Sequence, residues 1–158
     1  MDRDLLQMIN DTVGDKPKHR LILGGDICWN TKSFQCIEKI ACKNVILVGG
    51  NHDTTKNHYK AYRDAGWRIV GCYQMKDVIV THIPVHTSQV EAGSGYEEAR
   101  FEYNIHGHTH ELFVMKEISM TSNHRYLTRD SRYLNMSCEA IEFTPKTYEQ
   151  LVDYYKIA

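Results

Sequence analysis

Two kinds of hydrophobic pattern alternate along the first half of the chain. Apolar residues recur at helical spacing in three stretches and predict amphipathic helices over residues 3–13, 32–42 and 55–65. Between and after them, four short apolar runs predict buried strands at 20–23, 44–48, 78–81 and 103–106. Weaker runs at 67–70 and 72–75 are further candidate strands. This alternation is typical of an α/β fold.

The second half of the chain contains mostly strand patterns. Residues 83–103 read as a long loop with a short helix around 96–100, and strands are expected at 111–118 and 132–141. Thr147 and Gln150 stand at the spacing of a capping box, which predicts a final helix over 147–155. With 158 residues, the chain fits a single domain, 1–158.

Polar residues that bind metals follow each of the four buried runs. In chain order they are Asp26, Asn51 with His52, His82, and His108 with His110. Ligand sites in α/β sheets form outside the carboxyl ends of strands, so these side chains should converge. The alternating histidines of "HGHTH" also share one face of a strand, where three imidazolium charges would crowd together below about pH 6.5. A bound metal ion removes that crowding, because neutral imidazole is a common ligand.

Composition adds little beyond excluding some partners. The net charge of −1 indicates no general attraction to nucleic acid or to membranes. The five cysteines are odd in number and lack C-x-x-C spacing, which favours free thiols in a reducing compartment. The N-terminus has no signal-peptide pattern, and no run approaches the length of a membrane span. We therefore expect a cytoplasmic protein.

The order of the polar blocks resembles that of the calcineurin-like metallophosphoesterases. That family carries D-x-H, then G-D, G-N-H-D/E, a lone His and G-H-x-H. This chain has, in the same order, Gly25-Asp26, Gly50-Asn51-His52-Asp53, His82 and Gly107-His108-Thr109-His110. The segment "RYLNMSCEAIEFTPKTYEQL" is similar to the end of the small bacterial and phage members. The resemblance covers nearly all of the chain and implies two facing mixed sheets with helices outside, a four-layer α/β sandwich.

The resemblance also implies a set of residue roles. Two divalent ions would clamp a phosphate ester and activate a water, with Asp26 bridging both. One ion would be completed by Asn51, His82 and His108, and the other would be held by His110. His52 would be the general acid that protonates the leaving oxygen, and Asp53 would orient it. The amide oxygen of Asn51 suits Mn²⁺ or Fe²⁺, and Ni²⁺ and Zn²⁺ are alternatives.

One block of the family pattern has no counterpart. No Asp-x-His occurs in the first 40 residues, and the strand that carries it in the family would lie beside 20–23. Three interpretations stay open: a truncated chain or late start, a natural short form with one tight and one weak metal site, or a diverged binding protein. The missing neighbour would leave a sheet edge exposed, which a second copy of the chain would cover.

The leading hypothesis is metal-dependent hydrolysis of a phosphodiester or phosphomonoester. The alternative is a catalytically weak or inactive metal-binding interaction protein on the same fold. The remaining candidates receive structural or peripheral roles. His106 is expected to be structural, Cys28 a buried thiol, and His86 and Arg100 lesser candidates for substrate contact; His19, His58 and His124 are placed on the surface or in loops.

Overall fold

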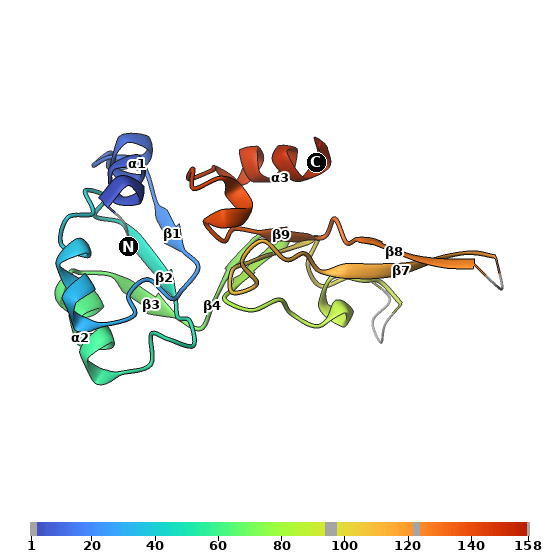
Figure 1. Ribbon diagram of the computed structural model, residues 1–158, viewed down its shortest axis with the longest axis horizontal. Helices are drawn as coiled ribbons and strands as arrows, with labels where there is room; N and C mark the ends of the chain where they lie inside the picture. The colour runs from blue at the N-terminus through green and yellow to red at the C-terminus, as the bar shows by residue number, and fades with distance from the viewer. Residues whose placement is uncertain (1–2, 94–97, 122–123, 158) are drawn as a thin grey trace.

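The computed structural model describes residues 3–93, 98–121 and 124–157, and helices and mixed sheets make up its elements (Figure 1). The α-helices are α1 (Arg3–Val13), α2 (Lys56–Asp64) and α3 (Tyr148–Ile157). Short 3₁₀ helices are η1 (Thr31–Cys36), η2 (Thr87–Gln89) and η3 (Glu139–Ile141).

The strands form two sheets and a separate hairpin. The first sheet is parallel, in the order β1-β2-β3, with β1 (Leu21–Leu23), β2 (Val45–Val48) and β3 (Arg68–Val70). The second sheet has the order β4-β5-β6-β9, with β4 (Cys72–Met75), β5 (Val78–Thr81), β6 (Tyr103–His106) and β9 (Tyr133–Asn135). In it, β4 runs antiparallel to β5, and β5, β6 and β9 are parallel. The hairpin of β7 (Met115–Thr121) and β8 (His124–Arg129) extends away from both sheets (Figure 1).

The first sheet lies between two hydrophobic clusters. On one face, Leu23 and Leu47 pack with residues of α1, α2 and η1. On the other face, Val48 packs with residues of the second sheet, such as Ile105, and with α3. Alternate residues of a strand point to opposite faces, which explains how one short sheet contributes to both clusters. The two sheets therefore face each other across the second cluster.

The expected α/β class is confirmed, and so are the helices at 3–13, 55–65 and 147–155 and the four buried strands. The capping box is formed as predicted, since Thr147 N–H donates to Gln150 Oε1 (2.9 Å) and Gln150 N–H donates to Thr147 Oγ1 (3.2 Å). The structure does not show the expected four-layer arrangement. The second face of the β4-β5-β6-β9 sheet is covered by loop residues, among them Val90 and Phe101, in place of helices.

The helix predicted over 32–42 is wrong, because only Thr31–Cys36 is helical and it is a 3₁₀ turn. The side chain of Asn10 explains the early end. Its Oδ1 accepts from Ala41 N–H (2.9 Å), and its Nδ2 donates to Lys39 O (2.8 Å). These backbone groups would otherwise continue a helical hydrogen-bond ladder.

Further elements differ from the prediction. The strand expected at 111–118 is found at Met115–Thr121, as β7. The strand expected at 132–141 ends at Asn135, whose Oδ1 accepts from Ser137 N–H (2.9 Å) and turns the chain towards η3. The strand β8 was not predicted. Of the short helix expected at 96–100, residues 96 and 97 lie outside the described residues, and 98–100 are not helical.

No helix within the described ranges is both long and apolar enough to cross a membrane.

The strand β1 is at an edge of its sheet in the described part of the chain. Self-association across that edge stays a prediction.

Candidate metal centre

The ends of four strands bring four predicted ligands to one place. Measured from Nε2 of His82, Asn51 Oδ1 lies at 2.8 Å, Asp26 Oδ2 at 3.2 Å and His108 Nδ1 at 3.2 Å. The ligand atoms of Asp26, His82 and His108 all lie within 4.8 Å of one another. Two of the four residues follow strands of the first sheet, and two follow strands of the second.

The chemistry of this donor set fits a cation. His82 Nδ1 lies 2.7 Å from the carbonyl oxygen of Gly24, which can only accept, so the hydrogen-bond network assigns the ring proton to Nδ1. In the neutral ring, Nε2 then carries a lone pair directed at Asn51 Oδ1 and Asp26 Oδ2. Several lone pairs facing one another repel unless a positive charge lies between them. His82 is only 7% exposed, so water does little to reduce that repulsion.

Glycines allow the turns that follow β1 and β2 to approach each other closely. Gly25 has φ +96°, in the region that favours glycine. A Cβ at this position would stand 2.7 Å from both Gly50 N and His82 Nδ1. Any other residue at position 25 would push these turns apart and move Asp26 away from His82.

Three predicted ligands adopt left-handed backbone conformations. The φ angles are 56° at Asp26, 65° at His108 and 51° at His110. A non-glycine residue in this region costs on the order of 1–3 kcal/mol, and such residues gather at functional sites where the surrounding structure enforces them. Three of the six non-glycine residues with positive φ in the described part of the chain are thus predicted ligands; the others are Lys76, Glu142 and Phe143.

Asp53 is fully buried and holds the two turns together. Its Oδ2 accepts from Asp26 N–H (2.7 Å) and Gly50 N–H (3.0 Å), and its Oδ1 accepts from the Tyr62 hydroxyl (2.5 Å). Burial, with the bond to Asp53, raises the pKa of Tyr62, so its hydroxyl keeps the proton that it donates. These contacts anchor Asp26, and they take the place of the contact with the His52 ring that the sequence predicted.

His52 is exposed beside the metal ligands. Its backbone N–H donates to Asp26 Oδ1 (2.8 Å), while its ring stacks on that of Trp29, with centroids 4.1 Å apart and planes at 32°. No described side chain hydrogen-bonds to the imidazole. The ring nitrogens are therefore available to a ligand at the metal centre.

His110 lies outside the group of Asp26, His82 and His108. Its Nδ1 lies 2.9 Å from Glu139 Oε1, and the side chains of both residues are largely exposed. The hydrogen bond raises the pKa of His110 and lowers that of Glu139. Among the described residues, the three-ligand group above is the one that could hold an ion. The structure thus shows one candidate ion position and leaves the second a prediction.

The comparison with protein families decides the affiliation of the chain. The family of the calcineurin-like phosphoesterase superfamily domain (Metallophos_2) matches residues 3–135. The chain belongs to this superfamily. The matched segment runs from α1 to the end of β9 and contains all four clustered ligands. Neither the comparison with curated proteins nor that with solved structures found a match.

Within this phosphoesterase domain, Asn135 supports the turn that carries His108 and His110. It is fully buried, and its Nδ2 lies 3.1 Å from Thr109 Oγ1, 2.6 Å from His110 O and 3.1 Å from Leu112 O. The Tyr155 hydroxyl donates to the Asn135 carbonyl (2.7 Å). Sequence reasoning missed this residue because nothing within the "YLN" strand distinguishes a supporting amide from a core residue.

The other histidines of the phosphoesterase domain lie away from the cluster. His106 is fully buried, and burial lowers its pKa, as suits the structural role expected for it. The surface position predicted for His58 is wrong, because its ring is buried and lies 2.8 Å from the Cys28 carbonyl. His86 and Arg100 are exposed on the 83–103 loop and are not among the clustered ligands.

Cys28 is a buried thiol, as predicted, and burial raises its pKa to about 11. It therefore stays protonated and unreactive near neutral pH. The cysteines in the described ranges are free.

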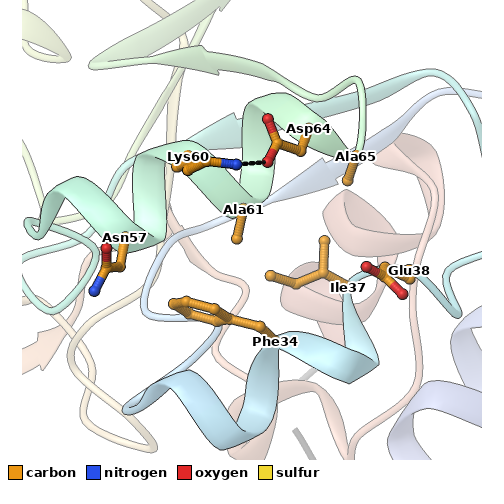
Figure 2. Close-up of a pocket in the computed structure, with 8 residues that line it drawn as sticks. All are labelled: Phe34, Ile37, Glu38, Asn57, Lys60, Ala61, Asp64 and Ala65. Atoms are coloured by element: carbon orange, nitrogen blue, oxygen red, sulfur yellow. Dashed lines mark hydrogen bonds and ion pairs between the residues drawn. The ribbon is translucent and has the colours of Figure 1, made fainter.

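A separate pocket lies between η1 and α2 and contains none of the candidate site residues (Figure 2). Phe34, Ile37 and Ala61 line its apolar wall, and Lys60 and Asp64 form an ion pair on α2. Its carboxylates, Glu38 and Asp64, belong to no group of three clustered ligands among the described residues, so we assign no part of the chemistry to it.

Proposed function

We propose that the protein hydrolyses a phosphate ester with a divalent transition metal held by Asp26, Asn51, His82 and His108. The observation that carries the proposal is the set of donor atoms converging on Nε2 of a nearly buried His82, whose Nδ1 lies against the Gly24 carbonyl. Mixed imidazole and oxygen donors suit Mn²⁺, with Fe²⁺, Ni²⁺ and Zn²⁺ as alternatives. Both phosphodiesters and phosphomonoesters are compatible with such a centre.

The chain contributes a proton donor beside the metal. A divalent ion in such a site polarises a phosphate oxygen and lowers the pKa of a water. The His52 backbone is tied to Asp26 Oδ1, which fixes its distance from the ligands, and its ring has no hydrogen bond within the described residues. A ring N–H of His52 can therefore donate to the leaving oxygen as the phosphate ester bond breaks.

The proposed stoichiometry is one tightly bound ion and one weakly bound ion. Four donors from this chain meet at the first position. At the second, Asp26 and His110 are the expected ligands, and the His110 ring is already hydrogen-bonded to Glu139. Fewer protein ligands give lower affinity, because water fills the remaining positions.

A metal-binding protein with little or no activity is the second candidate. The observation that favours it is that one group of three clustered ligands is found among the described residues, while His110, the expected ligand of a second ion, is hydrogen-bonded to Glu139. The exposed, unbonded ring of His52 favours the enzyme, since a purely structural metal does not require a proton donor beside it. Activity measurements on His52 variants separate the two.

The metal prediction is tested by elemental analysis after dialysis. We expect close to one ion per chain in the unaltered protein, lost in His82→Ala and in His108→Ala because each substitution removes a ligand. His110→Ala should change the content much less, and His86→Ala, an exposed loop histidine, is the matched control. Two dialysis-resistant ions per chain would show that another residue or a second copy completes the weak site.

The catalytic prediction concerns His52→Ala. Loss of a general acid typically costs about 10²–10⁴-fold in rate, and we expect a loss in that range with a phosphodiester that has a phenyl leaving group. Metal content should stay at the unaltered level, since the His52 ring is not among the clustered donors. If metal content fell together with activity in His52→Ala, His52 would be a ligand. If neither the unaltered protein nor His52→Ala hydrolysed the ester, the binding-protein interpretation would be favoured.

A further inference from the structure

Trp29 is the most exposed of the large hydrophobic side chains in the described part of the chain, with 70% of its surface accessible. Its one aromatic partner is His52, whose ring centroid lies 4.1 Å away. The planes are inclined by 32° to each other, a tilted contact that is closer to parallel than to edge-to-face. Packing into the hydrophobic core does not explain why the Trp29 indole lies here, because most of it is exposed to solvent beside the proposed proton donor.

The backbone on both sides of Trp29 is held in place. Cys28 is buried, and its carbonyl lies 2.8 Å from Nε2 of His58, a buried residue of α2. Asn30 caps η1, with its Oδ1 accepting from Lys32 N–H (3.0 Å). The indole is therefore carried by an anchored segment, and its position against His52 is set by the fold.

The His52 ring has few other restraints. Its backbone is fixed by the bond to Asp26 Oδ1, but its side chain makes no hydrogen bond to any described residue. Asp53, the neighbouring carboxylate, is fully engaged with Asp26, Gly50 and Tyr62. The stacking contact with Trp29 is thus the interaction that limits rotation of the imidazole.

We propose that Trp29 is a positioning residue, which holds the His52 ring in the orientation from which it donates its proton. The catalytic part of this inference rests on the proposed function, whereas the orientation of the ring does not. Stacked aromatic pairs restrict rotation with modest energy, so we expect loss of Trp29 to reduce the proton-transfer step about 3- to 10-fold.

The kinetic test uses two phosphodiesters that differ in their need for an acid. A 4-nitrophenyl leaving group departs readily without protonation, whereas a phenyl leaving group benefits from it. We expect Trp29→Ala to lower kcat for the phenyl ester about 3- to 10-fold and to leave kcat for the 4-nitrophenyl ester nearly unchanged, with KM unchanged for both. Trp29→Phe should restore most of the loss, and Tyr59→Ala, an exposed aromatic on α2, is the matched control.

Two kinetic outcomes would overturn the inference. An equal rise in KM for both esters, with kcat unchanged, would make Trp29 a substrate-binding surface. An equal fall in kcat for both esters would show a general disturbance of the centre in place of a specific effect on proton donation.

A second measurement does not depend on activity. In the Zn²⁺-loaded protein, the indole ring current should move the NMR signals of the His52 ring protons upfield. Trp29→Ala should abolish the shift, and Trp29→Phe should retain part of it. If the unaltered protein hydrolyses neither ester, nor the monoester 4-nitrophenyl phosphate, but shows this shift, the proposed function fails and the positioning of His52 stands. If the His52 signals are the same with and without Trp29, the inference is wrong whatever the activity.

Discussion

At the scale of single residues, the candidate metal centre depends on side chains other than the candidate ligands themselves. Asp53 joins the turns after β1 and β2, and Asn135 joins β9 to the turn after β6. Both are fully buried, and each forms hydrogen bonds to backbone groups of the ligand-bearing turns. The positions of the candidate ligand atoms therefore depend on Asp53 and Asn135, which hold the backbone of the turns that carry the ligands.

Asn135→Asp tests this dependence. The substitution replaces the amide nitrogen by an oxygen that faces Thr109 Oγ1, His110 O and Leu112 O, so a buried acceptor would meet oxygens of which two cannot donate. Supporting residues of this kind typically change metal affinity about 10–100-fold, and we expect a loss in that range. Competition with a coloured chelator measures the affinity. Asn57→Asp, an exposed position on α2, is the control, and equal affinities in the two variants would contradict the role given to Asn135.

How far the sequence predicts the centre differs between its residues. Asp26, Asn51, His82 and His108 could be predicted because each follows an apolar run, and parallel strands bring such positions to the same edge. Trp29, Glu139 and Asn135 could not, because their roles come from contacts with His52, His110 and the turn at 109–112, and their own neighbours in the sequence carry no sign of these contacts.

At the scale of elements, the hairpin of β7 and β8 is tied to the body at its base. Asp130 is fully buried, and its N–H donates to Val114 O (2.9 Å). Both of its carboxylate oxygens accept from Arg132, at 2.8 Å from Nε and 2.6 Å from Nη2. Arg132 in turn donates to the Val90 carbonyl (3.2 Å), so the hairpin base and the 83–103 loop are joined through one guanidinium.

This ion pair predicts an acid-sensitive contribution to stability. Burial raises the pKa of Asp130, but the hydrogen bonds from Arg132 and its charge lower that pKa by more than burial raises it. The net pKa of Asp130 is therefore below its ordinary value. A carboxyl group with a lowered pKa stabilises the fold above its unfolded pKa of about 3.9 and loses that contribution as the pH falls through its folded pKa. We expect Asp130→Asn to destabilise by about 1.5–3 kcal/mol at pH 7 and by clearly less at pH 2–3.

Urea unfolding at both pH values measures the difference. Asp64→Asn is the matched control, because Asp64 pairs with Lys60 on the exposed face of α2, where an ion pair contributes less than about 1 kcal/mol. A destabilisation by Asp130→Asn that is the same at pH 7 and pH 2 would show that charge has no part in it.

The elements that sequence patterns predicted poorly share a cause. The helix expected over 32–42 does not extend to its predicted end, where Asn10, 31 residues away, accepts from the Ala41 N–H. The strand β8 has exposed residues along most of its length, so it lacks the alternation that marks a strand with one buried face. The segment after η1 is bound by a residue distant in sequence, and β8 is paired with the preceding strand β7 without burying one face. In neither place does the local hydrophobic pattern indicate the structure.

At the scale of the whole molecule, the candidate metal centre lies between two sheets. Asp26 and Asn51 follow strands of the first sheet, and His82 and His108 follow strands of the second. An ion bound by all four therefore links two parts of the structure that otherwise contact through the hydrophobic cluster between them. Binding to the folded state alone must then stabilise the fold as a whole.

Thermal unfolding tests this linkage. At a free Mn²⁺ concentration about 100 times Kd, the gain is about 2.7 kcal/mol, which for a chain of 158 residues corresponds to a rise in Tm of roughly 5–11 °C. The rise should disappear with excess chelator and in His82→Ala, and it should persist in the control His86→Ala. An equal rise in the protein and in His82→Ala would place the stabilising ion elsewhere.

The connection between β6 and β9 also has a consequence for protein engineering. These strands are parallel neighbours in the second sheet, yet the chain between them leaves the sheet as the β7–β8 hairpin and returns at its base. The spacing of β6 and β9 is set by their own ladder, and the base is closed by Asp130 and Arg132, so neither depends on how long the hairpin is. Lengthening a loop costs only about 0.6 kcal/mol for each doubling. A foreign peptide or a small domain inserted between β7 and β8 would thus leave the geometry of the ligand-bearing turns unchanged. The hairpin is therefore a suitable insertion site for fusing a second domain to this phosphoesterase domain.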